Sequence, residues 1–227
     1  MSSEKTPEHP RQVYVLRASI AEIRPQIWRN LSVPGDYTLG DLHHILQIAF
    51  GWEDDHMHSF TINSVEYGMT EMDGMSFFND MDVIDEDDVC LDDLDLRPKQ
   101  KFTYLYDFGD SWEHNITVSK VVPAGVEAKG VNKDINKEQP RCLGGERAGP
   151  PEDVGGAWGY MDMLEALKDP GHQRYEEFQE WAGDLDPEHF DQEEINARFK
   201  AACEPPPEET EKKAPGGKAK KQAKDKE

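Results

Sequence analysis

The segment KFTYLYDFGDSWEHNITVSKVV, residues 101–122, constrains the fold of this 227-residue chain more than any other part of it. Aromatic and β-branched residues alternate with polar ones on both sides of Gly109 and Asp110, a pair that suits a two-residue hairpin turn. An isolated hairpin is marginally stable in water and needs further strands or helices to pack against. The segment therefore predicts two antiparallel strands within a larger sheet.

A two-residue turn also predicts which side chains meet. It places Asp107 opposite Trp112, and strand alternation then puts both on one face together with His114. Asp107 and His114 become diagonal neighbours, roughly 7–8 Å apart at Cβ, and the carboxylate would raise the histidine pKa. Such a pair either ties down the hairpin or takes part in catalysis. A bulged three-residue loop would instead exchange the two faces and separate the pair.

Strands and helices are predicted on both sides of this hairpin. Strand patterns occur at 12–20, 25–34, 56–63 and 65–68, and helical patterns at 38–52, 157–168, 173–182 and 191–202. The helix at 38–52 begins with a capping box between Thr38 and Asp41 and ends at Gly51. The order predicts an α+β fold: a mixed or antiparallel sheet with a β-grasp-like strand–strand–helix–strand arrangement, followed by a C-terminal helical group.

The chain divides into one domain with two tails. We expect a flexible N-terminus at 1–11, a single α+β domain at 12–203 and a disordered tail rich in Lys, Pro and Glu at 204–227. Within the domain, the acidic segment 71–95 is predicted to be an exposed loop or irregular insertion. The segment 123–156 shows no periodicity, and its length favours a functional loop.

The charge distribution limits the possible partners. The chain carries a formal charge of −22, and residues 71–95 hold eleven Asp or Glu and no Lys or Arg. Such a surface repels phosphate backbones, so DNA binding by the folded domain is disfavoured, whereas a basic protein partner or divalent cations would be attracted.

Compartment and membrane signals are sparse in this sequence. We expect no membrane span, because the apolar runs are short, and no signal peptide, because the first twelve residues lack an apolar core. The three cysteines, Cys90, Cys142 and Cys203, show no ligand spacing and predict free thiols in a cytoplasmic protein.

Several motifs occur in a recognisable order. These are IRPQIWR (23–29), TLGDLHHILQIAFGW (38–52), the HMHSF that follows, YLYDFGDSWEH (104–114) and PPEDVGG (150–156). Over roughly residues 12–200 the chain resembles the plasmid Ri Orf-three-like family, also labelled TnpR-family passenger proteins of an insertion element. The resemblance implies the fold and a possible association with mobile elements, and it implies no catalytic residues. The TnpR label denotes a resolvase, but the sequence shows no helix-turn-helix module beside a serine-nucleophile domain.

Histidines supply the candidate metal ligands. His56 and His58 are spaced to point to one face of a strand, and with Asp107 and His114 they form a candidate site for a divalent metal. The alternative is that these histidines lie beside an apolar face as satisfied core residues.

The loop CLGGERAGPPEDVGG at 142–156 is a second candidate region. Its glycines allow a close approach to a ligand, and Glu152 and Asp153 follow two prolines. The same pattern is typical of a rigid loop that leads into a helix. No lysine follows the glycines at the spacing of a phosphate-binding loop.

Other catalytic signatures are absent from the sequence. It contains no HExxH, GxSxG or GxGxxG motif, and the acidic run 80–88 lacks the central glycine of a calcium loop. His43 and His44 are adjacent on a helix, so we expect them to face different directions and not to act together as ligands.

Two functions remain open. The first is a non-catalytic acidic binding or adaptor module for a basic partner. The second is a metal-assisted hydrolase or other small enzyme built at the hairpin and the 142–156 loop. The candidate residues are Asp107, His114 and Glu152 for catalysis, Asp110, Trp112, Glu113 and Asp153 for ligand binding, and His56, His58, Asp107 and His114 for a metal.

Overall fold

The structure is a computed structural model that describes residues 11–72, 75–76, 83–123, 135, 138–182 and 185–204. The predicted N-terminal segment up to residue 10, the tail beyond residue 204, and parts of the acidic segment at 73–74 and 77–82 lie outside the described residues.

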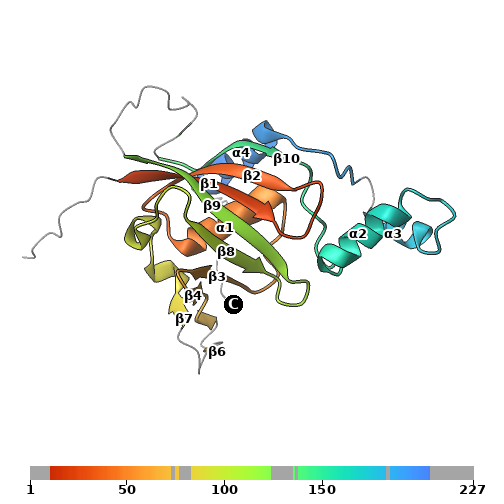
Figure 1. Cartoon of the computed structure of the whole chain (residues 1–227), viewed down its shortest axis with the longest axis horizontal. Helices are drawn as coiled ribbons and strands as arrows, with labels where there is room; N and C mark the ends of the chain where they lie inside the picture. Colours follow the sequence, from red (N-terminus) through yellow and green to blue (C-terminus); the bar gives the residue numbers. More distant parts are fainter. Residues whose placement is uncertain are drawn as a thin grey trace, which may run out of the picture.

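Within the described residues, one mixed sheet dominates the fold (Figure 1). Its eight strands lie in the order β10-β2-β1-β9-β8-β3-β4-β7. They are β1 (Gln12–Ile20), β2 (Trp28–Pro34), β3 (His58–Ile62), β4 (Val65–Gly68), β7 (Val83–Asp85), β8 (Lys101–Tyr106), β9 (Trp112–Pro123) and β10 (Arg141–Glu146). Strands β4 and β7 pair in parallel and the other neighbours pair antiparallel. The short strands β5 (Glu71–Met72) and β6 (Met75–Ser76) form a separate pair.

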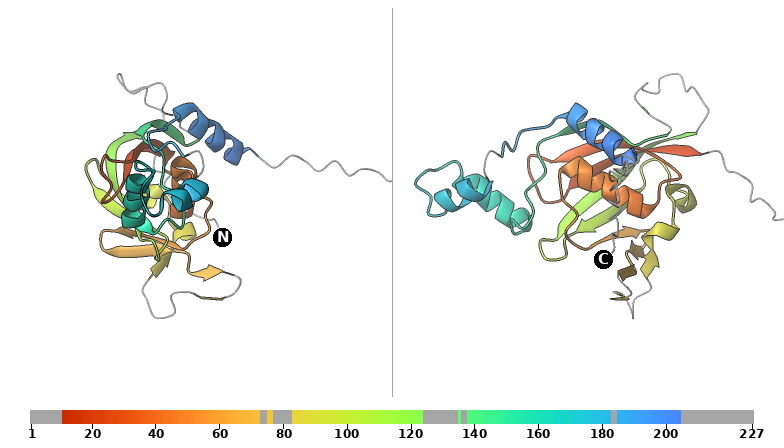
Figure 2. Two further views of the ribbon diagram at one scale, coloured as in Figure 1. Left: turned by 90° about the vertical axis from the view of Figure 1, so that its right-hand side faces the viewer. Right: turned by 180° about the vertical axis from the view of Figure 1, so that it is seen from behind.

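Helices lie on one face of this sheet and beyond its end. The described residues include α1 (Leu39–Phe50), α2 (Gly156–Ala166), α3 (Tyr175–Ala182) and α4 (Gln192–Cys203). Helix α1 packs on the sheet, α4 lies beside α1 and β10, and α2 and α3 project away from the sheet (Figures 1 and 2). The predicted α+β class is therefore confirmed.

Helix α1 has the ends that the sequence predicts. Thr38 and Asp41 form both hydrogen bonds of the capping box, and Gly51 ends the helix in the left-handed conformation with φ of 84°. Leu42 and Leu46 are fully buried in the core that α1 shares with the sheet. Each such side chain contributes about 1.5–3 kcal/mol by leaving water, so this apolar stripe fixes the helix on the sheet.

The segment 123–156 was predicted to be irregular, but it contains β10. This strand pairs with β2, and its register shifts at Gly144, which interrupts the alternation expected of a strand. Asn196 of α4 covers the outer edge: its amide accepts from the backbone N–H of Cys142 and donates to the carbonyl of the same residue. A side chain from a distant helix thus satisfies the backbone of one residue of this edge strand.

The acidic segment 71–95 is also more ordered than its charge predicts. It supplies β7 and two short 3-10 helices, η1 (Glu86–Asp88) and η2 (Leu91–Leu94). Leu91 is fully buried and Glu86 is only 4% exposed. The described part of this segment therefore packs against the core and is not simply an exposed loop.

The hairpin itself forms, but its turn is longer than predicted. Tyr106 pairs with Trp112 and Tyr104 pairs with His114, so residues 107–111 make the loop. The Asp107 carboxylate accepts from the backbone N–H groups of Gly109 and Asp110, which stabilises this wider turn. The longer loop exchanges the two predicted faces of β8, and its tyrosines join the buried face.

Candidate functional site

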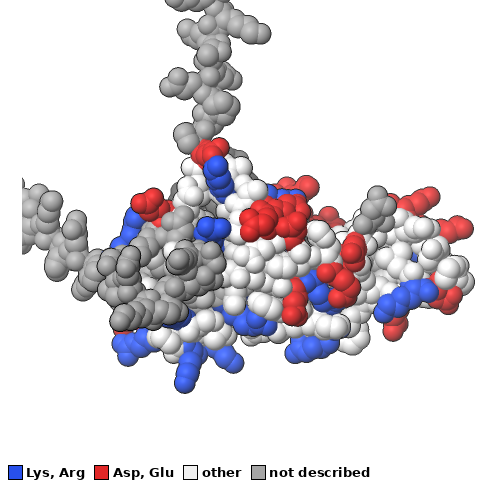
Figure 3. All heavy atoms as spheres, turned by 90° about the horizontal axis from the view of Figure 1, so that it is seen from above, with Lys and Arg blue, Asp and Glu red and all other residues white. Residues whose placement is uncertain are grey.

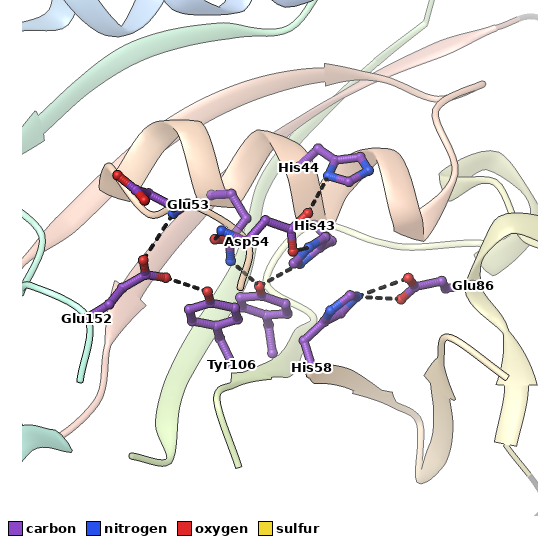
Figure 4. Close-up of polar contacts among 10 residues, drawn as sticks. His43, His44, Glu53, Asp54, His58, Glu86, Tyr106 and Glu152 are labelled. Atoms are coloured by element: carbon purple, nitrogen blue, oxygen red, sulfur yellow. Dashed lines mark hydrogen bonds and ion pairs between the residues drawn. The ribbon is translucent and has the colours of Figure 1, made fainter. Parts of the chain in front are cut away.

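Three loops meet at one end of the sheet, and we refer to this region as the three-loop junction. They are residues 51–57 after α1, residues 107–111 at the hairpin tip, and residues 147–155 before α2. Most of the polar residues that the sequence singles out lie here or in the adjoining network of Figure 4. The junction is therefore where the fold can assemble a site.

The hydroxyl of Tyr106 joins two of these loops. Tyr106 ends β8 and is fully buried, and its hydroxyl donates to a carboxylate oxygen of Glu152 (Figure 4). The backbone N–H groups of Asp55 and His56 also interact with the phenol oxygen. Burial raises the pKa of Tyr106 and Glu152 raises it further, so the phenol keeps its proton. The second carboxylate oxygen of Glu152 lies 3.3 Å from the backbone nitrogen of Glu53, which tightens the same connection.

Two contacts fix the loop before α2 from opposite sides. The indole nitrogen of Trp52 donates to the carbonyl of Pro150 over 2.8 Å. The carboxylate of Asp110 accepts from the backbone N–H of Gly155 over 3.0 Å. One contact comes from the loop after α1 and the other from the hairpin, so the loop is held by both neighbours.

Two glycines allow these loops to approach closely. A Cβ on Gly149 would lie 1.9 Å from the carbonyl oxygen of Phe50, and a Cβ on Gly156 would lie 2.3 Å from that of Asp110. Gly156 also has φ of 65°, which side chains disfavour. Gly149 and Gly156 therefore allow the backbones of neighbouring loops to pack closely.

His56, Asp107 and Asp153 bring one ligating atom each from the three loops to a common point. The Nε2 atom of His56 lies 3.4 Å from a carboxylate oxygen of Asp153 and 3.9 Å from Oδ2 of Asp107. The other oxygen of Asp107 binds the turn amides, so Oδ2 is directed to His56. The side chains of His56 and Asp107 are 26% and 11% exposed, whereas Asp153 is 75% exposed. The group is therefore anchored on its inner side and accessible from its outer side.

A second polar group lies deeper, beneath α1. Gln47 donates to the hydroxyl of Tyr104, and the backbone N–H of Asp54 donates to the side-chain oxygen of Gln47. His43 closes the circuit: its Nδ1 lies 2.7 Å from the Tyr104 hydroxyl, and its Nε2 lies 2.6 Å from the Asp54 carboxylate. We refer to this closed set of hydrogen bonds as the polar ring. Because a carboxylate only accepts, His43 donates through Nε2 and accepts from Tyr104 through Nδ1. Burial lowers the pKa of His43, which agrees with this neutral tautomer. Each of the four residues in the polar ring has a hydrogen-bond partner within it.

Two further histidines, His44 and His58, lie beside the polar ring. His44 approaches the other oxygen of Asp54 at 3.3 Å, so His43, His44 and Asp54 converge. His58 stacks on His43 with ring centroids 3.4 Å apart, and its Nε2 lies 2.8 Å from a carboxylate oxygen of the buried Glu86. As expected, His43 and His44 face different directions, with side chains that are 2% and 65% exposed. The loop after α1 nevertheless brings Asp54 within reach of both histidines, which their spacing on the helix does not predict.

His114 is a core residue. It is fully buried, its Nδ1 donates to the carbonyl of Trp112 over 2.9 Å, and its ring packs edge-on against Phe50 and Trp52. Burial lowers its pKa to about 4, against smaller opposite contributions from nearby backbone groups. The imidazole is therefore neutral at physiological pH.

The predicted pair of Asp107 and His114 is wrong. The longer loop takes Asp107 out of the strand, where its carboxylate faces the turn amides and His56. His114 contacts aromatic rings and a backbone carbonyl instead. Its pKa is consequently lowered by burial, whereas the pairing predicted a rise.

The predicted metal set divides into three places. His56 and Asp107 meet at the three-loop junction, where Asp153 joins them. His58 binds Glu86, and His114 lies in the aromatic core. Sequence spacing could not separate these histidines, because their partners come from loops distant in the chain.

The remaining candidates have distinct positions. Trp112 is 1% exposed in the core, and Glu113 is exposed on the outer face of the sheet. Asp110 and Glu152 hold the loop before α2 through Gly155 and Tyr106. These contacts position the junction, and Asp153 is the most accessible of the acidic candidates there.

Sequence reasoning did not identify the residues that organise the junction. Tyr106, Asp54 and Glu86 are not among the candidates that the sequence singles out. A usable signal is the sequence WEDDH at 52–56, which places acids and a histidine directly after the end of a helix. Chain reversals of this kind often carry functional residues.

Comparisons with known proteins show the family and support the fold. The family described as plasmid pRiA4b ORF-3-like protein matches residues 12–194. The chain belongs to this family. The uncharacterized protein y4hQ of Sinorhizobium fredii is 34% identical to this chain over 171 residues, which cover 75% of this chain and 81% of that protein.

A solved structure has the same fold. The crystal structure of the protein of unknown function MM3350 from Methanosarcina mazei Go1 has a TM-score of 0.66 and 37% identity, and covers 82% of this chain and 98% of that one. Among the described residues of this pRiA4b ORF-3-like chain, no helix has both the length and the apolar character needed to cross a bilayer.

Replacing Tyr106 with Phe tests the connection between the loops. The variant loses a hydrogen bond to a carboxylate, so we expect the free energy of unfolding to fall by about 1.5–3 kcal/mol in urea titrations. Tyr160→Phe is the matched control, because the buried hydroxyl of Tyr160 has no hydrogen-bond partner among the described residues. Equal stability of Tyr106→Phe and wild type would contradict the role of this hydroxyl.

His114 predicts an acid-dependent loss of stability. The unfolded chain binds a proton at this histidine near pH 6.5, whereas the folded chain binds it only near pH 4. Stability should therefore be unaffected above pH 6.5 and fall as the pH decreases towards 4, by on the order of 3 kcal/mol in total.

Urea unfolding of wild type and His114→Gln across this pH range measures the effect. The difference in the free energy of unfolding between the two proteins should shrink as the pH falls. In the control His189→Gln, which replaces an exposed histidine, the pH dependence of stability should equal that of wild type. A constant difference between wild type and His114→Gln would show that His114 is not buried as a neutral group.

Proposed function

We propose that this protein is a divalent-metal-binding module whose metal centre is formed by His56, Asp107 and Asp153. The observation that carries the proposal is the convergence of these three ligating atoms from three separate loops. One imidazole and two carboxylates suit a first-row transition metal such as Zn²⁺ or Mn²⁺. Three protein ligands leave coordination positions open for water or for a ligand atom of a partner.

The two separations of His56 from the carboxylates support a metal more than a hydrogen bond, and all three ligating atoms lie within 4.8 Å of one another. Atoms that bind one metal at about 2.0–2.2 Å lie roughly 3.0–3.5 Å from each other. The His56–Asp153 separation of 3.4 Å falls in this range, and the His56–Asp107 separation of 3.9 Å needs only a small movement. Both separations are long for hydrogen bonds.

The arrangement around these ligands also supports the proposal. The turn amides orient Asp107 through its other oxygen, and the interaction of Tyr106 with the backbone at His56 holds that loop. Metal sites depend on such outer contacts for ligand orientation. Asp107 and Asp153 both have positive φ, near 55°, a conformation that aspartate tolerates better than most residues.

The neighbouring group of His43, His44 and Asp54 is the weaker candidate. Its hydrogen bonds of 2.6–2.7 Å already satisfy His43 on both nitrogens. A metal bound to Nε2 of His43 would displace the proton that this nitrogen donates to Asp54, so it would break the polar ring. Among the residues that the structure describes, the side chain of His56 makes no comparably short hydrogen bond that a metal would have to break.

The geometry favours binding over hydrolysis. Of the three residues considered for catalysis, His114 is enclosed in the core, and Glu152 uses both oxygens in the contacts to Tyr106 and Glu53. Asp107 remains as a metal ligand. A hydrolase would also need a group free to move a proton at the metal, and neither His114 nor Glu152 is placed to do so.

The acidic surface supports a protein partner with basic residues. The formal charge of −22 favours such a partner and opposes the binding of DNA by the folded domain. A cytoplasmic setting is part of the same proposal, since Cys90, Cys142 and Cys203 are free thiols. The association with mobile elements rests on the plasmid origin in the family description.

Calorimetric titration of chelator-treated protein with Zn²⁺ and Mn²⁺ tests the proposal. One equivalent of at least one of these metals should bind, and Asp107→Asn should weaken it at least about tenfold, because a neutral amide is a poorer ligand than a carboxylate. Asparagine tolerates the same positive φ and keeps the turn hydrogen bonds, so the fold should persist.

The control distinguishes the two groups of ligands. His44→Asn removes a ligand of the group beneath α1, and it should leave the metal affinity unchanged. Loss of binding in His44→Asn but not in Asp107→Asn would move the centre to His43, His44 and Asp54. Absence of metal binding by the wild type would overturn the proposal.

A further inference from the structure

A small pocket lies beside the three-loop junction, between the loop before α2 and helix α3. It has a volume of about 210 Å³ and is lined by Asp153, Val154, Arg174, Glu177, Phe178 and Trp181. Sites for small molecules usually occupy roughly 300–1,000 Å³. The pocket is therefore sized for a single side chain, not for a cofactor.

One wall of this pocket is aromatic and accessible. Trp181 is 45% exposed, and Phe178, which lines the same pocket, is 4% exposed. The guanidinium of Arg174 already stacks on Phe178, with its central carbon 4.0 Å from the ring centroid. Planar cations pack well on aromatic faces, so the same wall is suited to a second guanidinium.

The charges of the pocket favour a cation. Arg174 forms ion pairs of 2.8 Å with Asp162 and with Glu177, which offset its charge. Asp153, which is 75% exposed, lines the pocket together with Glu177. The lining therefore holds two carboxylates and one guanidinium, and the guanidinium is also neutralised by Asp162 from outside the pocket, so a cation is favoured over an anion.

The surroundings extend this preference over the projecting helices. Residues 156–182 contain six acidic and two basic residues. Figure 3 shows carboxylates on the end of the molecule formed by α2 and α3. A basic segment of another protein would be attracted to this end before any specific contact forms.

We infer that this pocket binds an arginine side chain of a basic protein partner. The guanidinium stacks on Trp181 and forms ion pairs with Asp153 and Glu177. The inference goes beyond the proposed metal centre and does not require a metal. Because Asp153 belongs to both places, a bound metal would remove one carboxylate from the pocket, so the test is carried out with chelated protein.

An acetylated and amidated penta-arginine peptide is the probe, with penta-glutamate as its opposite. Binding to the full-length chain is measured by calorimetry and by the indole N–H signals of the five tryptophans in NMR spectra. We expect penta-arginine to bind and to shift the Trp181 signal, and penta-glutamate not to bind. Trp181→Ala should weaken penta-arginine binding by about fivefold, the scale of a single cation–π contact.

Trp158→Ala is the matched control, because Trp158 is 79% exposed on α2 and does not line the pocket. Its affinity should equal that of wild type. An unchanged affinity in Trp181→Ala, or an equal loss in Trp158→Ala, would reduce the interaction to unspecific attraction by an acidic surface and overturn the inference.

The chain's own tail is the alternative occupant. Residues 204–227 include seven lysines. In the absence of peptide, replacing these lysines with Gln in the full-length chain should leave the Trp181 indole signal unchanged. A shift of that signal would assign the pocket to the tail and overturn the assignment to a partner. Loss of metal binding in Asp107→Asn does not affect these outcomes, so the two proposals fail separately.

Discussion

The buried hydroxyl of Tyr106 connects parts of the chain that are far apart in sequence. It donates to Glu152 and interacts with the backbone at Asp55 and His56, at the point where β8 leaves the core. The loop after α1 and the loop before α2 therefore meet at this one oxygen. The contact helps to hold the three-loop junction, where His56, Asp107 and Asp153 converge.

Other residues of the segment YDFGDSWEH, 106–114, support the same junction from the core and from the hairpin loop. Trp112 and His114 fill the core under Trp52, and Trp52 in turn holds Pro150. Asp110 holds Gly155 from the hairpin side. The crowding of acids, a histidine and aromatics around one glycine thus has a mainly structural explanation, and Asp107 is the member whose carboxylate is directed to a possible ligand.

The junction also concentrates negative charge that the fold does not neutralise internally. Glu53, Asp55 and Glu152 lie close together beside the three proposed ligands. Carboxylates held this near one another repel, and a cation relieves the repulsion. The pocket beside Trp181 repeats the pattern with an aromatic wall, which is why its expected ligand is an organic cation and not a metal ion. Both proposals therefore follow from one property of the surface.

Local patterns in the sequence determined the α+β class, the capped helix α1 and the existence of the hairpin, because propensity, capping and alternation act over a few residues. Family resemblance identified the motifs but not their roles. Tertiary structure alone decided the hairpin register: with residues 107–111 as the loop, Tyr104 and Tyr106 are buried in the core and Asp107 leaves the strand to bind the turn amides. It also decided the partners of the histidines: His56 meets Asp153, His58 meets Glu86, and His114 meets aromatic rings. These contacts join residues separated by tens of positions, and their geometry depends on how the whole sheet and its loops pack.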